Sequence, residues 1–202
     1  MKIITVAHQK GGVGKTTLSL NLAYCFAQGA RVAIVDSDPQ GSATNLKEIL
    51  SKHRIDLIES GDIPNVQALY DIVIIDTPPY LTTSLPDFFS YSDFVLVPTK
   101  ASILDIMAIR ATIQLLKQAQ KLKPSLRALI ILNMIKPSTT LTDDIKEALQ
   151  HYSFPLADTT ISDRVSYTRS PISGGVFETD DSKAKDEIIS LTQEIISSLQ
   201  KS

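Results

Sequence analysis

Short apolar runs alternate along the chain with longer segments in which apolar residues recur at helical spacing. We predict buried strands at residues 2–7, 31–35, 71–75, 94–98 and 128–133. We predict helices at residues 16–28, 103–121, 142–150 and 182–199. This alternation indicates βαβ units and a parallel sheet that is buried on both faces.

The predicted fold class is therefore α/β, with a doubly wound, mainly parallel sheet and helices on both faces. No repeat, low-complexity tract or linker divides the sequence, so we expect a single domain over residues 1–202. Residues 51–65 show no clear periodicity, and we interpret them as irregular surface.

Polar side chains follow several of the predicted strands directly. A glycine-rich loop follows the first strand, Asp36 and Asp38 follow the second, Asp76 follows the third and Asn133 ends the fifth. Ligands of such sheets bind beyond the carboxyl ends of the strands. We expect these residues to meet at one edge of the sheet.

The strongest motif is the sequence KGGVGKTT at residues 10–17, which lies between a strand and a helix. Glycines allow the backbone N–H groups to surround phosphate oxygens, and the helix N-terminus adds partial positive charge. We expect Lys15 to reach the β- and γ-phosphates of a nucleotide and the Thr16 hydroxyl to ligate Mg²⁺. The predicted nucleotide-binding residues of the loop are Lys10, Gly11, Gly12, Val13, Gly14, Lys15, Thr16 and Thr17.

This loop departs from the usual P-loop pattern, because Gln9 stands where a glycine is common and Lys10 precedes the glycines. The form KGGxGK[ST] resembles the deviant Walker A loop of the family that contains ParA, MinD and the nitrogenase iron protein. The resemblance implies that Lys10 crosses a dimer interface and touches the nucleotide of the partner subunit. A cation supplied in this way can stabilise transition-state charge.

Two acidic segments resemble the other nucleotide-binding motifs of the same family. Residues 36–44 match the pattern DxDPQGxAT, in which the second aspartate, Asp38, is implied to orient the attacking water. Residues 71–79 form an apolar run that ends in Asp76, which is typical of a Walker B strand. Thr16, Asp76 and Asp36 are the predicted magnesium residues. The catalytic residues that we predict are Lys10, Lys15 and Asp38.

The composition is that of a globular protein, and it limits the chemistry. Of the 202 residues, 43% are hydrophobic, and the formal net charge is -2, so any nucleic-acid contact must come from a local basic patch. Cys25 is the single cysteine, which excludes an intrachain disulfide and a cysteine-held iron–sulfur cluster within one chain. We expect a cytoplasmic protein.

The C-terminal third resembles small plasmid-partition ATPases such as ParF, through residues 160–167, residues 174–178 and the lysines before the last helix. The resemblance implies a weak, partner-stimulated ATPase that forms an ATP-bridged homodimer, with polymer formation left open. It also implies that Asn133 contacts the purine base. Because the chain begins at the phosphate-loop strand, we expect no helix-turn-helix for operator DNA and a separate centromere-binding partner like ParB or ParG.

Relatives of this kind bind DNA without sequence preference in the ATP state, through basic surface residues, and so associate with the nucleoid. Such contacts would be made to phosphates and would weaken with salt. The candidate residues here are Arg110, Lys117, Lys121, Lys123, Arg164, Arg169, Lys183 and Lys185.

Three other functions remain open from the sequence. A ParA-like ATPase could position a cargo other than DNA, and the motor would look the same. A MinD-like membrane switch needs a basic amphipathic C-terminal helix, whereas the polar face here carries Asp186, Glu187 and Glu194, so we expect no membrane contact and a helix packed on the core. A metabolic P-loop enzyme would need a further group of residues that binds a second substrate, and we find no such group in the sequence.

Overall fold

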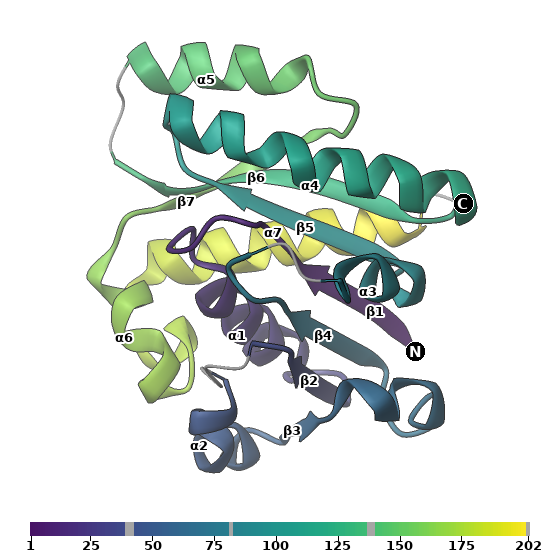
Figure 1. Ribbon diagram of the computed structural model, residues 1–202. Helices are drawn as coiled ribbons and strands as arrows, with labels where there is room; N and C mark the ends of the chain where they lie inside the picture. The colour runs from purple at the N-terminus through teal and green to yellow at the C-terminus, as the bar shows by residue number, and fades with distance from the viewer. Residues whose placement is uncertain (39–42, 81–82, 137–139, 201–202) are drawn as a thin grey trace.

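The computed structural model describes residues 1–38, 43–80, 83–136 and 140–200. In this part of the chain, one parallel sheet has the strand order β3-β2-β4-β1-β5-β6-β7 (Figure 1). The strands are β1 Lys2–Val6, β2 Val32–Asp36, β3 Ile55–Ile58, β4 Ile72–Asp76, β5 Phe94–Thr99, β6 Arg127–Ile135 and β7 Leu156–Ser162. The predicted fold class is confirmed, and β1 lies at the centre of the sheet.

Helices cover both faces of the sheet. They are α1 Lys15–Phe26, α2 Lys47–Lys52, α3 Leu85–Tyr91, α4 Ile103–Leu122, α5 Thr140–Gln150, α6 Val165–Ser173 and α7 Ser182–Gln200. Buried residues of α1 and α7 share one core cluster, whereas those of α3, α4 and α5 share the cluster on the opposite face. In Figure 1, α4 and α5 lie side by side above the sheet.

Alternation along the central strands builds these two cores. In β5, Phe94 and Leu96 join the cluster with α1 and α7, while Val95 and Val97 join the cluster with α4. All four side chains are fully buried. Successive side chains of a strand point to opposite faces, so a continuous apolar run serves both layers.

Two strands differ from the sequence-based expectation. Residues 51–65, which we interpreted as irregular, contain β3 and a 3₁₀ helix at Ser60–Asn65, so this interpretation is wrong. The strand was missed because it is short and lies at the sheet edge, where Ile55 alone is buried. The opposite edge strand, β7, was also not predicted.

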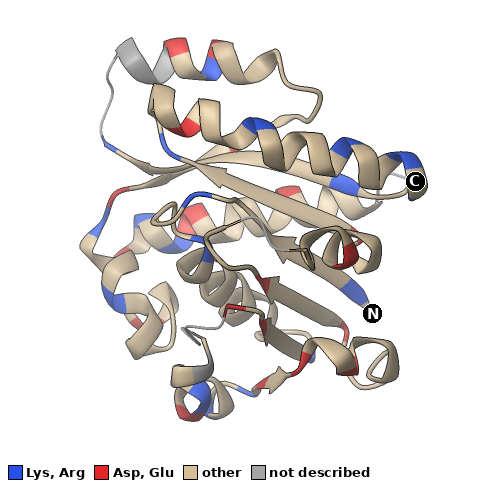
Figure 2. Ribbon diagram, viewed as in Figure 1, with Lys and Arg blue, Asp and Glu red and all other residues tan. Residues whose placement is uncertain are grey.

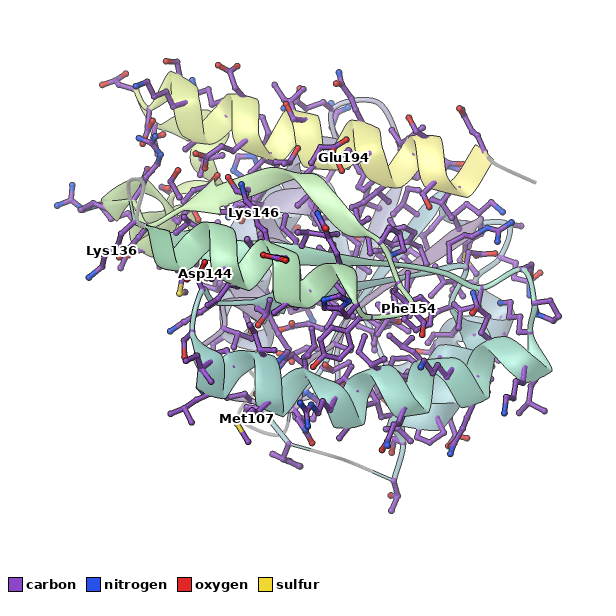
Figure 3. All side chains as sticks on the ribbon, turned by 90° about the horizontal axis from the view of Figure 1, so that it is seen from above. Met107, Lys136, Asp144, Lys146, Phe154 and Glu194 are labelled. Carbon is purple, nitrogen blue, oxygen red and sulfur yellow. The ribbon has the colours of Figure 1, made fainter. Side chains whose placement is uncertain are left out.

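The edge strand β7 contains several polar residues, and helix α7 supplies hydrogen-bond acceptors to its backbone. The Glu194 carboxylate accepts the Asp158 N–H at 3.0 Å and the Thr159 N–H at 2.7 Å. Figure 3 shows Glu194 on α7 where this helix passes β7. Four residues of α7, from Ala184 to Ile195, belong to the core, which confirms the prediction that this helix packs on the domain. Among the described residues, no helix has both the length and the apolar character needed to span a bilayer.

Candidate nucleotide-binding site

The phosphate loop connects β1 to α1 at the centre of the sheet. Gly12 and Gly14 have φ values of 71° and 85°, a region that side chains other than hydrogen strongly disfavour. A Cβ atom on Gly14 would also collide with the side-chain amide of Asn133. These two glycines therefore serve both the backbone conformation and the close packing of the loop.

Asn133, on strand β6, contacts the phosphate loop through its side chain. Its side-chain amide donates to the Val13 carbonyl at 2.7 Å, and the residue is 3% exposed. Asn133 also borders a small pocket with Thr17, Met134 and Asp163, at the C-terminal end of β6. In the structure, Asn133 therefore supports the phosphate loop through its hydrogen bond to Val13. Its contact with a purine base stays a prediction.

Asp76 is a fully buried carboxylate at the end of β4. Its oxygens accept hydrogen bonds from the Thr16 hydroxyl at 2.6 Å and from the Ser19 hydroxyl at 3.0 Å. Burial raises the pKa of Asp76 to about 7, an effect that the two hydroxyl donors oppose and nearby Asp36 increases. Sequence reasoning missed Ser19, although it lies one turn after Thr16 on α1.

These groups fit the magnesium site that the sequence predicts. A carboxylate and a hydroxyl supply the oxygen ligands that Mg²⁺ prefers. Burial disfavours the ionised form of the Asp76 carboxyl group. A cation beside Asp76 would favour this ionised form. Thr16 and Asp76 are the residues that would hold the ion next to the phosphates.

Asp36 is the last residue of β2 and pairs with Asp76 on the adjacent strand β4, and Asp38 follows two residues later. The Asp36 carboxylate accepts the N–H groups of Asp38 at 3.2 Å and Ala43 at 2.8 Å. Asp36 therefore binds the backbone at Asp38 and at Ala43. Residues 39–42 of the predicted DxDPQGxAT segment lie outside the described residues.

Lys15 and Asp38 face the same space. Lys15 is 6% exposed, and burial lowers the pKa of its ammonium group, while Asp76 and Asp38 act in the opposite direction. The Lys15 ammonium group donates to the Lys10 carbonyl at 3.3 Å. A cavity of about 200 Å³ is lined by Gly12, Gly14, Lys15, Thr16, Thr17, Asp38, Thr77 and Pro79. Phosphate-binding, metal-binding and water-orienting candidates therefore meet at one cavity.

Gly11 and Lys10 form the outer part of the loop. A Cβ atom on Gly11 would lie 3.3 Å from Pro79 Cβ, which is closer than packing normally allows. The Lys10 N–H donates to His8 Nδ1 at 2.8 Å. The Lys10 side chain turns towards α4, where its Nζ lies 2.8 Å from Asp105 Oδ1.

Residues 4–176 match the model of the CobQ/CobB/MinD/ParA nucleotide binding domain. The chain belongs to this family. Membership accounts for the observed combination of a lysine-led glycine loop, a parallel sheet and a carboxylate at the end of β4.

Other members of the ParA/MinD family match over most of the chain. Maintenance of carboxysome distribution protein A of Halothiobacillus neapolitanus is 31% identical over 208 residues, and the match covers 96% of each chain. The chromosome-partitioning ATPase Soj of Thermus thermophilus is 28% identical over 211 residues, covering 85% of each. A putative plasmid partition protein from Borrelia burgdorferi B31, solved with AMPPNP, has a TM-score of 0.73 and 22% identity, covering 97% of this chain and 98% of that one.

In this ParA/MinD family member, some of the candidate DNA-binding residues have hydrogen-bond or ion-pair partners within the chain, and others are exposed. Lys123 donates to the carbonyl oxygens of residues 90–92 and so closes the end of α3. Arg164 pairs with Asp181 and Glu187, each at 3.5 Å. Both side chains therefore have structural partners within the domain.

Three other basic candidates lie on one exposed stripe of α4. Arg110, Lys117 and Lys121 are exposed, and their spacing of seven and four residues places them on the same side of the helix. Figure 2 shows basic segments recurring along α4. The remaining candidates lie on α6 and α7, where Arg169 and Lys183 are exposed and Lys185 is partly exposed.

Proposed function

We propose that the protein is a ParA-type ATPase that binds ATP with Mg²⁺, forms an ATP-bridged homodimer and slowly hydrolyses ATP to drive segregation of plasmid or chromosomal DNA. A centromere-binding protein would link the dimer to the DNA cargo, and non-specific DNA of the nucleoid would serve as the track. The observation that carries the proposal is that Lys15, Thr16 and Asp38 line one cavity. The Thr16 hydroxyl also donates a hydrogen bond to the Asp76 carboxylate.

Each residue has a distinct part in this proposal. Lys15 and the loop N–H groups bind the phosphates, and Asp38 orients the attacking water. Lys10 of one subunit adds positive charge at the nucleotide of the other. Mg²⁺, when held by Thr16 and Asp76, neutralises phosphate charge. Positioning and charge stabilisation account for most of the catalysis in phosphoryl transfer, so no further nucleophile is needed.

Two observations favour DNA as the track and cargo. Soj, which matches 85% of the chain, is a chromosome-partitioning ATPase. Arg110, Lys117 and Lys121 offer three cations on one exposed side of α4, in a protein whose net charge is only -2. Such a stripe can neutralise successive phosphates of a duplex.

The test is binding to non-specific duplex DNA with ATP and Mg²⁺, with ADP and without nucleotide, over a series of salt concentrations. Binding that requires ATP and weakens as salt rises supports the proposal. A protein that hydrolyses ATP in the same preparation but binds no DNA in any state contradicts DNA as the track.

A second candidate function is the positioning of a protein compartment. The carboxysome-distribution relative covers 96% of both chains, which favours this alternative. Deletion of the gene in its host separates the two. Loss of the replicon that carries the gene supports DNA segregation, whereas stable inheritance with clustered protein compartments supports the second candidate.

A further inference from the structure

The Lys10 side chain is held by a carboxylate of its own subunit. Lys10 Nζ lies 2.8 Å from Asp105 Oδ1 in the first turn of α4. The Asp105 side chain is only 4% exposed, whereas that of Lys10 is 40% exposed. The aspartate is thus fixed in the protein, while the lysine can leave without repacking the core.

A second contact aligns the loop with the same helix. The Gln9 side-chain amide donates to the Ala108 carbonyl, one turn after Asp105. The Asp105 backbone is also ordered, because its N–H donates to the Ser102 carbonyl at 3.1 Å. The residues just before the glycines therefore contact the first turns of α4 at two points, through Lys10 and through Gln9.

Departure of Lys10 would leave Asp105 without its counter-ion. In the part of the chain that the structure describes, no cation other than Lys10 forms an ion pair with Asp105. An uncompensated charge in such a site is unfavourable, so the ion pair opposes any movement of Lys10 away from its own subunit.

The surface around this ion pair is apolar. Ile103, Leu104 and Met107 flank Asp105 on α4 and are 66%, 70% and 56% exposed. In Figure 3, Met107 points away from the body of the domain. A second copy that covered this surface would bury these side chains next to Lys10, at the place where the lysine must cross.

We propose that Asp105 is a positioning residue that retains Lys10 within its own subunit and thereby sets the threshold for dimerisation. This inference rests on the proposed function, in which Lys10 reaches the nucleotide of a second copy. ATP carries more negative charge than ADP, so ATP competes better with Asp105 for the lysine. The ion pair thus keeps the ADP-bound protein monomeric and reserves the dimer for the ATP state.

The central test is Asp105→Asn, which keeps the shape of the side chain and removes its charge. We expect the dissociation constant of the dimer, measured by sedimentation with a non-hydrolysable ATP analogue, to fall by about 10-fold, equivalent to about 1.4 kcal/mol. Nucleotide affinity of the monomer should not change, because Lys15 and the loop N–H groups bind the subunit's own phosphates. Dimerisation that is unchanged or weaker overturns the inference.

Three further variants separate charge from structure. Asp105→Ser is a second uncharged variant and should tighten the dimer even if Asp105→Asn folds poorly. Asp105→Glu keeps the charge, so its dimer should remain close to that of the unmodified protein. Asp71→Asn removes the exposed ion pair with Arg31, also 2.8 Å long, and should leave dimerisation unchanged. Equal effects of the Asn and Glu variants would mean that shape matters rather than charge, which contradicts the inference.

The same measurements distinguish this inference from the function on which it rests. If the unmodified protein binds the analogue but never dimerises, the ATP-bridged dimer of the proposed function is wrong, and the inference falls with it. If the unmodified protein dimerises and neither uncharged variant tightens the dimer, the inference alone is wrong.

Discussion

At the scale of single residues, the site depends on titratable groups that are buried but have hydrogen-bond or charged partners. Asp76 is fully buried and accepts two hydroxyl groups, and Lys15 is nearly buried beside Asp76 and Asp38. Groups of this kind are held in place for an incoming ligand, because each has few alternative positions. Replacing one of them should change binding or turnover more than stability.

Lys15→Ala should abolish tight ATP binding. The ammonium group supplies charge-assisted hydrogen bonds to phosphate, and their loss should weaken affinity by about 100-fold or more. A filter-binding assay with labelled ATP measures the change. Lys2→Ala is the matched control, since this lysine lies at the other end of β1 and its side chain is 51% exposed. Retained tight binding in Lys15→Ala would contradict the phosphate-loop assignment.

Asp38→Ala should separate binding from hydrolysis. The variant keeps Lys15, Thr16 and Asp76, so ATP binding and dimerisation should persist. Turnover should fall by about 100-fold or more, because the attacking water is no longer oriented. Steady-state phosphate release measures this loss. A variant that hydrolyses ATP at the normal rate would remove Asp38 from the mechanism.

His8 should make the domain sensitive to mild acid. Burial, followed by the charge of Lys15, lowers the pKa of His8 from 6.5 to about 4. The unfolded chain therefore takes up this proton at a higher pH than the folded protein does. Stability due to neutral His8 is present above pH 6.5 and is lost as the pH falls towards 4.

Urea unfolding at pH 7 and pH 5 tests this linkage through a comparison of variants. Between the two pH values, the unmodified protein should lose about 2 kcal/mol more stability than His8→Asn does. The comparison is needed because other groups, including Asp76, also titrate in this range. His151→Asn, at an exposed histidine, should behave like the unmodified protein. Equal pH dependence in His8→Asn would show that His8 does not titrate as expected.

At the scale of elements, α7 secures the edge of the sheet through carboxylates rather than through apolar contacts alone. Glu194 accepts two N–H groups of β7, and Glu187 accepts the Ser162 N–H at 3.1 Å and the Ser162 hydroxyl at 2.6 Å. Glu187 also accepts the Tyr167 hydroxyl at 2.8 Å. The loop after β7, which borders the pocket near Asn133, is thereby tied to the C-terminal helix.

Glu194→Gln should loosen this edge strand. A glutamine keeps one acceptor oxygen but turns a second, donating group towards the β7 backbone, which should cost about 1–3 kcal/mol. Hydrogen exchange at the Asp158 and Thr159 amides and urea unfolding measure the effect. Asp186→Asn, an exposed position on the same helix, should change neither quantity. Unchanged exchange in Glu194→Gln would mean that these hydrogen bonds contribute little.

At the scale of the whole molecule, charge is distributed unevenly. The net charge is -2, yet the exposed stripe of α4 carries Arg110, Lys117 and Lys121. Long-range repulsion from an acidic domain would oppose DNA binding, so a local stripe must act at short range. Doubling this stripe in a dimer would increase the number of phosphates that the protein neutralises.

Combined substitution of Arg110 and Lys117 by alanine should weaken DNA binding in the ATP state without changing ATP hydrolysis in the absence of DNA. The slope of log affinity against log salt should become shallower by about 0.9 for each phosphate that the variant no longer neutralises. Lys47→Ala combined with Lys52→Ala removes two exposed lysines of α2 and is the matched control. DNA binding with an unaltered salt slope would exclude α4 as the DNA surface.

The sequence alone determined the α/β class, the phosphate loop and the two acidic strand ends, because these depend on local periodicity and on residues close together in the chain. Tertiary structure decided the rest. It placed Ser19 on Asp76, joined Asn133 to Val13 across 120 positions and supplied Glu194 to β7. It also paired Lys10 with Asp105. Such contacts arise where distant segments pack together, and no local pattern of residues reports which side chains will then lie within bonding distance.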